Sequence, residues 1–515
     1  LVGSEMCIRD RNNGAILTGN DSYDGKEKVS VFAMANVGYK DMVYLDGTVR
    51  NDWSSTLSPG NNSYFYWSTG LSFILTQAFE IPKEILTFGK LRGSVATVGN
   101  DAPFDSLYDG LNLANTYLGM PYYMTDNTRK NPNLKPEQTT SYEVGADFRF
   151  WNNRISVDFT YYWKSTTDQI MRASVSSASG YRERFVNAGE IQNRGAELTA
   201  SITPVKTKNF EWTTIFNWSK NNSKIVSLTP GVDRYQVRAA GADGCISYVE
   251  VGKPYGQMYG TDWQRDAAGN VIADSSGKPL EQKDVYIGHV EPDFLGGWKN
   301  QFRYKGFDFS FLFDFKKGGL FYSETAYKGN NMGNSIKSLE GRDEYFFSKW
   351  VLDESDQERA GYLRPTDVPF PADNLANRVP YMDGARPKGV YFPGRVFEAS
   401  IEGIGGHPVV NDWVKPDVMF CHISGRNAKM NTYDATYVKL REVALGYTFP
   451  KKLLRKTPFQ SLRLSAVGRN LAILFQNTPQ GIDPEATSTT GNGQGFEQGY
   501  PLPTATYGFD LKVTF

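Results

Sequence analysis

The feature that most constrains the fold of this chain is a set of long segments in which apolar and polar residues alternate. In the stretch FDFSFLFDF (307–315) a phenylalanine occupies every second position, and Asp308, Ser310 and Asp314 lie between them. Alternate residues of an extended strand point to opposite faces, so the phenylalanines would share one face and the polar residues the other. The stretch therefore predicts a strand with one aromatic and one charged face.

The same alternation recurs in about 13 segments of roughly 9 to 14 residues each. A tilted strand needs about 9 to 11 residues to cross a bilayer, whereas strands of soluble proteins usually have about 5 or 6. The segments are therefore long for a soluble protein. They are 28–39, 42–53, 64–76, 88–98, 141–150, 154–164, 194–203, 210–220, 294–304, 307–315, 436–449, 461–471 and 505–515.

One segment changes phase. In YVKLREVALGYTF (437–449) the apolar positions Val438 and Leu440 are followed by Val443 and Leu445, so the alternation shifts by one residue. An extra residue in one strand of a pair has this effect. We expect either a β-bulge here or a first half of the strand that rises above the bilayer.

The links between segments alternate between short and long. Short links lie at 40–41, 151–154, 203–209, 304–307 and 449–459, and long ones at 54–63, 99–137, 165–193, 221–292, 316–435 and 472–504. Alternate links of a meander lie at opposite ends of the sheet. One end would thus carry tight turns and the other the elaborate loops, as in outer-membrane barrels. Loops of roughly 70 and 120 residues would be hard to place in a compact soluble domain.

We therefore predict an all-β fold, an antiparallel transmembrane β-barrel with meander topology and long extracellular loops. A soluble sandwich also alternates apolar and polar faces, so the decision rests on strand length and loop asymmetry. Bacterial barrels of this type have an even strand number. About 13 strands would then be an incomplete part of a larger barrel, and we expect that barrel to have 22 strands.

Composition and motifs exclude several function classes. No run approaches the roughly 18 apolar residues of a spanning helix. The formal net charge is 0, which gives no electrostatic case for nucleic acid as a partner. Motifs of serine hydrolases, zinc proteases and nucleotide-binding loops are missing, and the three cysteines form no close pair. We expect no enzyme activity, no catalytic or metal-binding residues and no cofactor.

Three loop aromatics are candidate contact residues. The stretch PYGQMYGTDWQRD carries Tyr255, Tyr259 and Trp263 within one of the longest loops. Exposed aromatic rings stack on sugars or pack on a protein partner, and loops commonly carry function. The alternative is that these rings form the small core of the loop itself.

Several stretches together resemble one family. NPNLKPEQTTSYEVGADFRFWNNRISVDFTYYWKSTTDQI (131–170), NAGEIQNRGAELT (187–199) and YVKLREVALGYTFPKKLL (437–454) are similar to SusC/RagA-like TonB-dependent outer-membrane transporters. GRNLAIL, GIDPE and the ending YPLPTATYGFDLKVTF resemble the same family. The similarity runs from about Val29 to Phe515, and Trp53 departs from it where the family usually has glycine.

The resemblance implies an importer in the outer membrane of a Gram-negative bacterium. Such transporters take up oligosaccharides or peptides together with a SusD-like lipoprotein that closes the extracellular mouth. The implied partners are this lipoprotein, the TonB energy-coupling complex, outer-membrane lipid and the barrel-assembly machinery. In the family the terminal aromatic, here Phe515, belongs to the signal for barrel insertion.

The ends of the family pattern suggest how the chain is divided. LVGSEMCIRD (1–10) resembles translated sequencing adapter, so we expect this segment to be non-native. Residues 11–515 are then expected to be the C-terminal part of the barrel, with the plug domain and the TonB box absent. A complete plug within the chain would contradict this division.

Two other function classes compete with import. The first is a passive porin or barrel adhesin, which a plug and a TonB-contacting segment in the full-length protein would exclude. The second, less favoured, is a secreted carbohydrate-active β-sandwich enzyme, which membrane fractionation would separate from a transporter.

Overall fold

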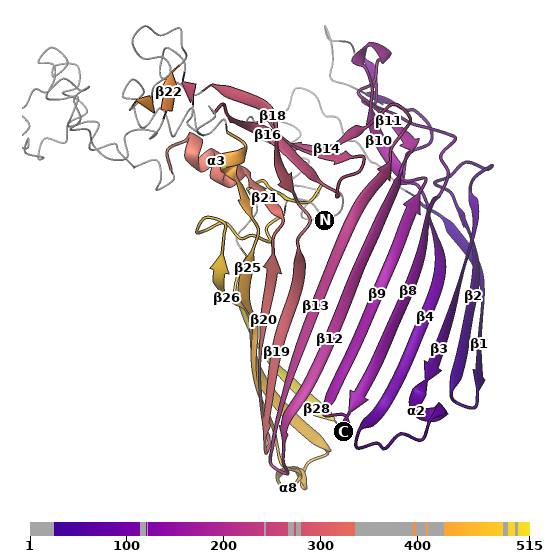
Figure 1. Cartoon of the computed structure of the whole chain (residues 1–515), viewed down its shortest axis with the longest axis vertical. Coiled ribbons are helices and arrows are strands. Elements are labelled where there is room, and N and C mark those ends of the chain that lie inside the picture. The colour runs from indigo at the N-terminus through magenta and orange to yellow at the C-terminus, as the bar shows by residue number, and fades with distance from the viewer. Residues whose placement is uncertain are drawn as a thin grey trace, which may run out of the picture.

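A single antiparallel sheet dominates the computed structural model, which describes residues 25–113, 120, 122–240, 244–265, 272–273, 280–334, 395–397, 408–409, 427–487, 493–499 and 503–514. Thirteen strands pair in the order in which they follow along the chain, so the sheet is a meander (Figure 1). The predicted architecture is confirmed. The strands are β1 (Lys28–Tyr39), β2 (Val43–Ser54), β3 (Ser63–Ile74), β4 (Leu86–Asn100), β8 (Glu137–Phe150), β9 (Ile155–Thr167), β12 (Glu190–Lys206), β13 (Phe210–Ser227), β19 (Phe294–Tyr304), β20 (Phe307–Lys317), β25 (Tyr437–Thr448), β26 (Ser461–Gln476) and β28 (Thr506–Thr514).

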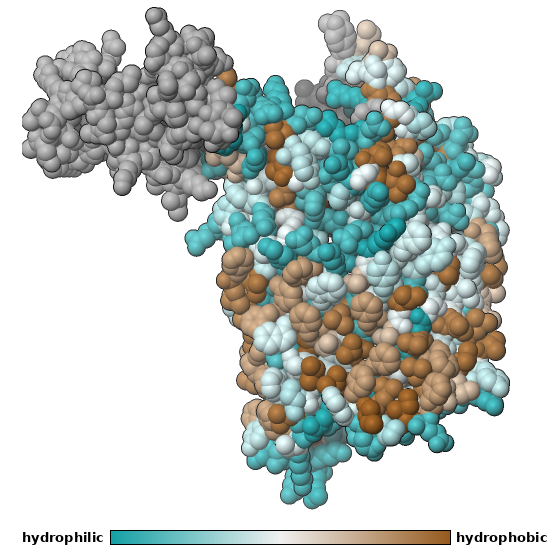
Figure 2. All heavy atoms as spheres, in the orientation of Figure 1, coloured by the Kyte–Doolittle hydropathy of each residue, from teal (hydrophilic) through white to brown (hydrophobic). Residues whose placement is uncertain are grey.

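The apolar face of the sheet is exposed. On β20, Phe309 is 39% exposed and lies opposite Phe302 of β19 and Leu445 of β25. The rings of Phe302 and Phe309 stack with centroids 6.2 Å apart. Figure 2 shows hydrophobic side chains gathered in a band over the strands, with hydrophilic residues above and below it. Soluble monomers rarely expose so continuous an apolar surface, so this band is the lipid-facing surface of a membrane barrel.

The apolar residues of the alternating segments point outward along the sheet, as the alternation predicts. Several aromatic and aliphatic side chains of this face are exposed, and others are half-buried by their neighbours on the same face. The exposed ones include Phe159, Tyr161, Trp163, Trp298, Tyr304, Phe307 and Leu511, and the half-buried ones include Ile155, Val157, Phe311 and Val513. Half-burial arises because aromatic neighbours cover one another, as Phe311 and Phe313 do with centroids 5.3 Å apart.

The tight turns all lie at one end of the sheet. Because neighbouring strands are antiparallel, the links 40–42, 151–154, 207–209 and 305–306 fall at the same end (Figure 1). Lys40 and Asp41 adopt φ of 50° and 54°, and Lys305 adopts 53°. Such left-handed residues match a tight hairpin to the twist of its strands. The short helices α2 (Leu75–Ala78) and α8 (Lys451–Leu454) close the two longer links at this end.

The opposite end carries folded loops with sheets of their own. These sheets contain β5 (Leu111–Leu113) with β6 (Tyr123–Thr125); β10 (Ile170–Ser174), β11 (Glu183–Asn187) and β7 (Thr128–Arg129); β14 (Arg234–Ala240), β15 (Cys245–Glu250), β16 (Gln257–Trp263) and β18 (Glu281–His289); β24 (Thr432–Asp434), β21 (Leu320–Ser323) and β27 (Phe496–Glu497); and β17 (Ile272–Ala273), β22 (Arg395–Phe397) and β23 (Pro408–Val409). The helix α3 (Glu324–Asn331) follows β21 directly.

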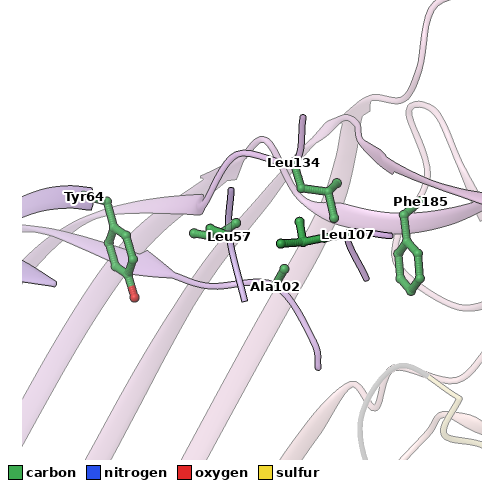
Figure 3. Close-up of a cluster of buried hydrophobic side chains, with 6 residues drawn as sticks. All are labelled: Leu57, Tyr64, Ala102, Leu107, Leu134 and Phe185. Atoms are coloured by element: carbon green, nitrogen blue, oxygen red, sulfur yellow. The ribbon is translucent and has the colours of Figure 1, made fainter. Parts of the chain in front are cut away.

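Much of the buried apolar core lies in this loop layer. Leu57 from the link between β2 and β3 packs together with Leu107 and Leu134, both from the link between β4 and β8, and with Phe185 of β11 (Figure 3). A second cluster joins Met258 of β16 to other loop residues. A membrane barrel needs no apolar core within its wall, because lipid covers the apolar side of the strands. The apolar burial that stabilises the loops is therefore separate from the wall.

The predicted phase change is a β-bulge. The pairing of β20 with β25 shifts between Leu312 and Phe313, where Arg441 of β25 has no partner residue. The pairing of β25 with β26 shifts between Leu440 and Glu442. The extra residue places Arg441 and Glu442 on the same side as Lys439, so the bulge concentrates charge on the inner face.

Some of the sequence-based expectations concern residues that the structure does not describe. Residues 1–10 and Phe515 are among them, so the non-native segment and the insertion signal stay predictions. Among the described residues, no helix is both long enough and apolar enough to cross a membrane.

Candidate functional site

The inner face of the sheet is a polar wall in which several charged side chains form ion pairs. Arg92 of β4 donates to both carboxylate oxygens of Asp158 at 2.9 and 2.7 Å, and to Thr160 at 2.6 Å. Arg463 donates to Asp308 at 3.1 and 2.6 Å. Bidentate pairs of this kind hold both side chains in one geometry. The wall is therefore hydrophilic but locally neutral, as suits a hydrated lumen.

The sheet formed by β14, β15, β16 and β18 has one buried face and one face lined by tyrosines. Tyr259 makes an edge-to-face contact with Tyr248 at 5.6 Å between centroids and a tilted contact with Tyr286 at 5.4 Å. The Arg234 guanidinium lies 4.2 Å from the Tyr248 ring centroid and 4.9 Å from that of Tyr259. We call Arg234, Tyr248, Tyr259 and Tyr286 the tyrosine face; Tyr286 is 50% exposed.

Polar contacts fix the tyrosine face. Arg234 pairs with Asp284 at 3.1 Å, and the Tyr259 hydroxyl donates to Glu250 at 2.6 Å. Burial, followed by this hydrogen bond to a carboxylate, raises the pKa of Tyr259 to about 12. Tyr259 therefore stays protonated at neutral pH and presents an uncharged ring that is fixed in orientation.

The other two predicted aromatics lie elsewhere. Tyr255 packs against the cluster formed by Ile191, Ile225 and Val249, and burial raises the pKa of its hydroxyl. Trp263 is 4% exposed. The structure thus separates the three residues: Tyr259 joins the tyrosine face, Tyr255 lines a pocket in the lumen, and Trp263 is buried. Their role as ligand or partner contacts stays a prediction.

The pocket lies on the inner face where β9, β12 and β13 reach the loop layer. We call it the luminal pocket; its volume is about 380 Å³ and its lining residues are Thr166, Gln169, Ile191, Asn193, Asn221, Ser223, Tyr255, Val290, Glu291, Pro292 and Gln494. Small-molecule pockets commonly measure about 300–1,000 Å³ and contain a few convergent polar groups. The luminal pocket meets both criteria.

Hydrogen bonds organise the polar wall of this pocket. Glu291 accepts from Asn221 Nδ2 at 2.5 Å, from the Ser223 amide at 3.1 Å and from the Ser223 hydroxyl at 2.8 Å. Asn221 Nδ2 also donates to Asn193 at 3.0 Å, and its Oδ1 accepts from Tyr162 at 3.1 Å. The side chains are held in place by one another, which preorganises the wall for a ligand.

A second cluster of charges ties the last loop to the wall. Lys439 of β25 contacts Asp483 at 2.6 Å and Glu485 at 2.5 Å, and Arg441 contacts Glu485 at 2.7 Å. We call Lys439, Arg441, Asp483 and Glu485 the loop anchor. Arg441 also pairs with Asp314 of β20. The anchor thus connects the loop segment GIDPE to the wall at the bulge.

Sequence reasoning missed the luminal pocket. The segment predicted at 210–220 ends too early, because β13 continues to Ser227. The polar run that contains Asn221 and Ser223 continues the alternation of the inner face, and this was the available signal. Glu291 follows β18 and is brought to the pocket by the loop fold, for which the local sequence gives no pattern. Among the described residues, no group of three His, Cys, Asp or Glu side chains could hold a metal.

The fold and the wall can be compared with known proteins. The model of the family described as TonB dependent receptor-like, beta-barrel, matches residues 8–338. The chain belongs to this family. Its members are outer-membrane receptors and transporters, and the chain is similar to members named SusC and RagAB.

Curated relatives include TonB-dependent receptor P3 of Formosa agariphila, 26% identical over 99% of this chain and 48% of its own length. TonB-dependent receptor SusC of Bacteroides thetaiotaomicron is 28% identical over 66% of this chain and 37% of its own length. This chain therefore spans about half the length, or less, of these two relatives. The structure of the RagAB peptide transporter shares the fold with a TM-score of 0.66 at 19% identity, over 95% of this chain and 48% of that one.

Proposed function

We propose that this chain forms part of an outer-membrane transporter that imports oligosaccharides or peptides with energy supplied through TonB. The observation that carries the proposal is the sheet itself. Its exposed apolar face suits lipid, its ion-paired inner face suits water, and one end carries folded loops able to meet a ligand. Membership of the TonB-dependent receptor family favours active import over a passive pore or an enzyme.

The proposed partners follow from the relatives. The likeness to SusC and to the RagAB peptide transporter supports a SusD-like lipoprotein that covers the loop layer. The tyrosine face is our proposed contact for ligand or lipoprotein in this layer. Tyrosine and arginine are enriched at binding hot spots. A tyrosine ring buries a large rigid surface at low entropic cost, and an arginine guanidinium donates several hydrogen bonds.

Uptake measurements test this function. The full-length receptor would be produced in a Gram-negative host, with and without TonB and with and without its adjacent SusD-like lipoprotein. Entry of labelled oligosaccharides and peptides would be followed. We expect uptake of one ligand class that falls to background without TonB and is weakened without the lipoprotein.

A matched pair of variants addresses the tyrosine face. Tyr286→Ala removes its most exposed ring, whereas Tyr304→Ala removes a ring of similar exposure from the strand wall. We expect reduced uptake from the first variant and normal uptake from the second. Uptake that persists without TonB would indicate a passive porin, and unchanged uptake by Tyr286→Ala would remove the tyrosine face from the proposal.

A further inference from the structure

The luminal pocket is built from segments that lie far apart in the sequence. Thr166 and Gln169 belong to the end of β9 and its following link, Asn193 to β12, and Ser223 to β13. Glu291 reaches it from the link between β18 and β19. A cavity into which polar groups from so many elements converge is a better ligand site than a gap between loops.

The lining indicates the charge of the ligand. Its described residues include one carboxylate, Glu291, and no lysine, arginine or histidine. An anionic ligand would meet the Glu291 charge without a compensating cation. Three hydrogen bonds from Asn221 and Ser223 already occupy most of the roughly four acceptor positions of the Glu291 carboxylate, which leaves little capacity for an ammonium group. The lining therefore favours an uncharged ligand.

The remaining groups indicate hydrogen bonding together with apolar contact. Asn193, Gln169 and Thr166 supply amide and hydroxyl groups, while Tyr255 and Pro292 supply apolar surface. Oε1 of Gln169 is buried and has no hydrogen-bond donor among the described residues. A buried acceptor without a donor is unfavourable, so a hydroxyl group from a ligand would satisfy a need that the protein leaves open.

We propose that the luminal pocket binds an uncharged, hydroxyl-rich sugar unit of an imported oligosaccharide, with Gln169, Asn193 and Glu291 as polar contacts and Tyr255 as the apolar wall. The inference rests on the proposed import function and narrows its ligand class. A volume of about 380 Å³ suits a short segment of a longer glycan. The rest of the glycan would extend towards the loop layer.

The variant Gln169→Met gives the cleanest test. It removes the unpartnered oxygen while keeping the length of the side chain, and it breaks no side-chain hydrogen bond among the described residues. A purely structural role predicts unchanged or slightly higher stability and unchanged binding. A ligand contact predicts binding that is weaker by about three- to tenfold, the effect of losing one hydrogen bond.

The control is Asn217→Ala, which lies on the same inner face of β13 but outside the luminal pocket. Titration calorimetry on the full-length receptor would compare neutral hexose oligosaccharides, matched oligosaccharides that carry uronic acids, and uncharged peptides. We expect the neutral oligosaccharides to bind best, Gln169→Met to weaken them and Asn217→Ala to leave them unchanged.

Other results would overturn the inference in distinguishable ways. Normal binding and import of neutral oligosaccharides by Gln169→Met would reject the luminal pocket as a ligand site and leave the proposed import function standing. Tighter binding of uronic-acid oligosaccharides or of peptides, weakened by Gln169→Met, would reject the uncharged sugar but keep the site. If none of the three ligand classes is bound or imported, the proposed function fails together with the inference.

Discussion

Replacing Phe309 with arginine is expected to lower the free energy of unfolding in lipid vesicles by about 2 to 4 kcal/mol, the cost of a cation on the lipid face near the middle of the bilayer. Phe309 is 39% exposed, and its cross-strand neighbours Phe302 and Leu445 also belong to the apolar face. The arginine would thus have no polar side chain directly opposite it. Folding titrations of the full-length receptor in vesicles would measure the effect.

The matched control is Ser310→Arg, the same change one residue along β20. Ser310 lies on the inner face opposite Gln301 and Ala444, where a hydrated lumen accepts a charge. We expect a cost well below that of Phe309→Arg. Asp158 and Asp308 also lie on the inner face but are less suitable as controls, because each pairs with an arginine of the wall. Equal costs at positions 309 and 310 would contradict the membrane facing.

The second large effect concerns the loop anchor. Lys439→Met is expected to cost about 3 to 5 kcal/mol, because it leaves the buried Asp483 carboxylate without a cation to balance its charge. The side chains of Lys439 and Asp483 are 6% and 5% exposed. Denaturant unfolding and protease cleavage within residues 477–487 would report the loss. Lys206→Met breaks an exposed pair with Glu211 and is expected to cost about 0 to 1 kcal/mol.

The pH dependence of the anchor gives an independent readout. Burial alone would raise the pKa of Glu485, but hydrogen bonds from Lys439, Arg441 and Tyr437 outweigh it and lower the pKa from 4.5 to about 2. A depressed pKa contributes stability that is fully present above pH 4.5 and is lost as the pH falls towards 2. This acid-labile contribution should be missing from Glu485→Gln. An identical acid profile for both proteins would remove Glu485 from the anchor.

The barrel strands could be predicted from the sequence because a lipid-facing wall imposes its period on every strand. Each of the predicted segments overlaps a strand of the sheet, and the order of short and long links gives the meander. Even the irregularity at Arg441 left a signal, since a bulge shifts the alternation. The strand ends were less predictable. At the loop end, β12 begins at Glu190 and β13 continues to Ser227, beyond the segments in which apolar and polar residues alternate.

The candidate site was harder to predict for a physical reason. Aromatic content drew attention to Tyr255, Tyr259 and Trp263, but composition alone does not separate a buried ring from an exposed one. Burial of Trp263 and exposure of Tyr286 depend on how the loop sheet packs. The luminal pocket depends on Glu291 and Asn221 meeting across a sequence separation of 70 residues. Local periodicity carries no information about such contacts.

The central claim is tested most directly by measuring which residues of β20 face lipid and which face water in a bilayer. Single cysteines at positions 307 to 315 of the full-length receptor would be spin-labelled in lipid vesicles, and their accessibility to oxygen and to a water-soluble nickel complex compared. We predict a period of two, with labels at the phenylalanine positions exposed to oxygen in lipid and labels at positions such as Asp308 and Ser310 exposed to nickel in water. Loss of the alternation, or phenylalanine positions shielded from both reagents, would contradict a membrane-spanning wall and the transporter built on it.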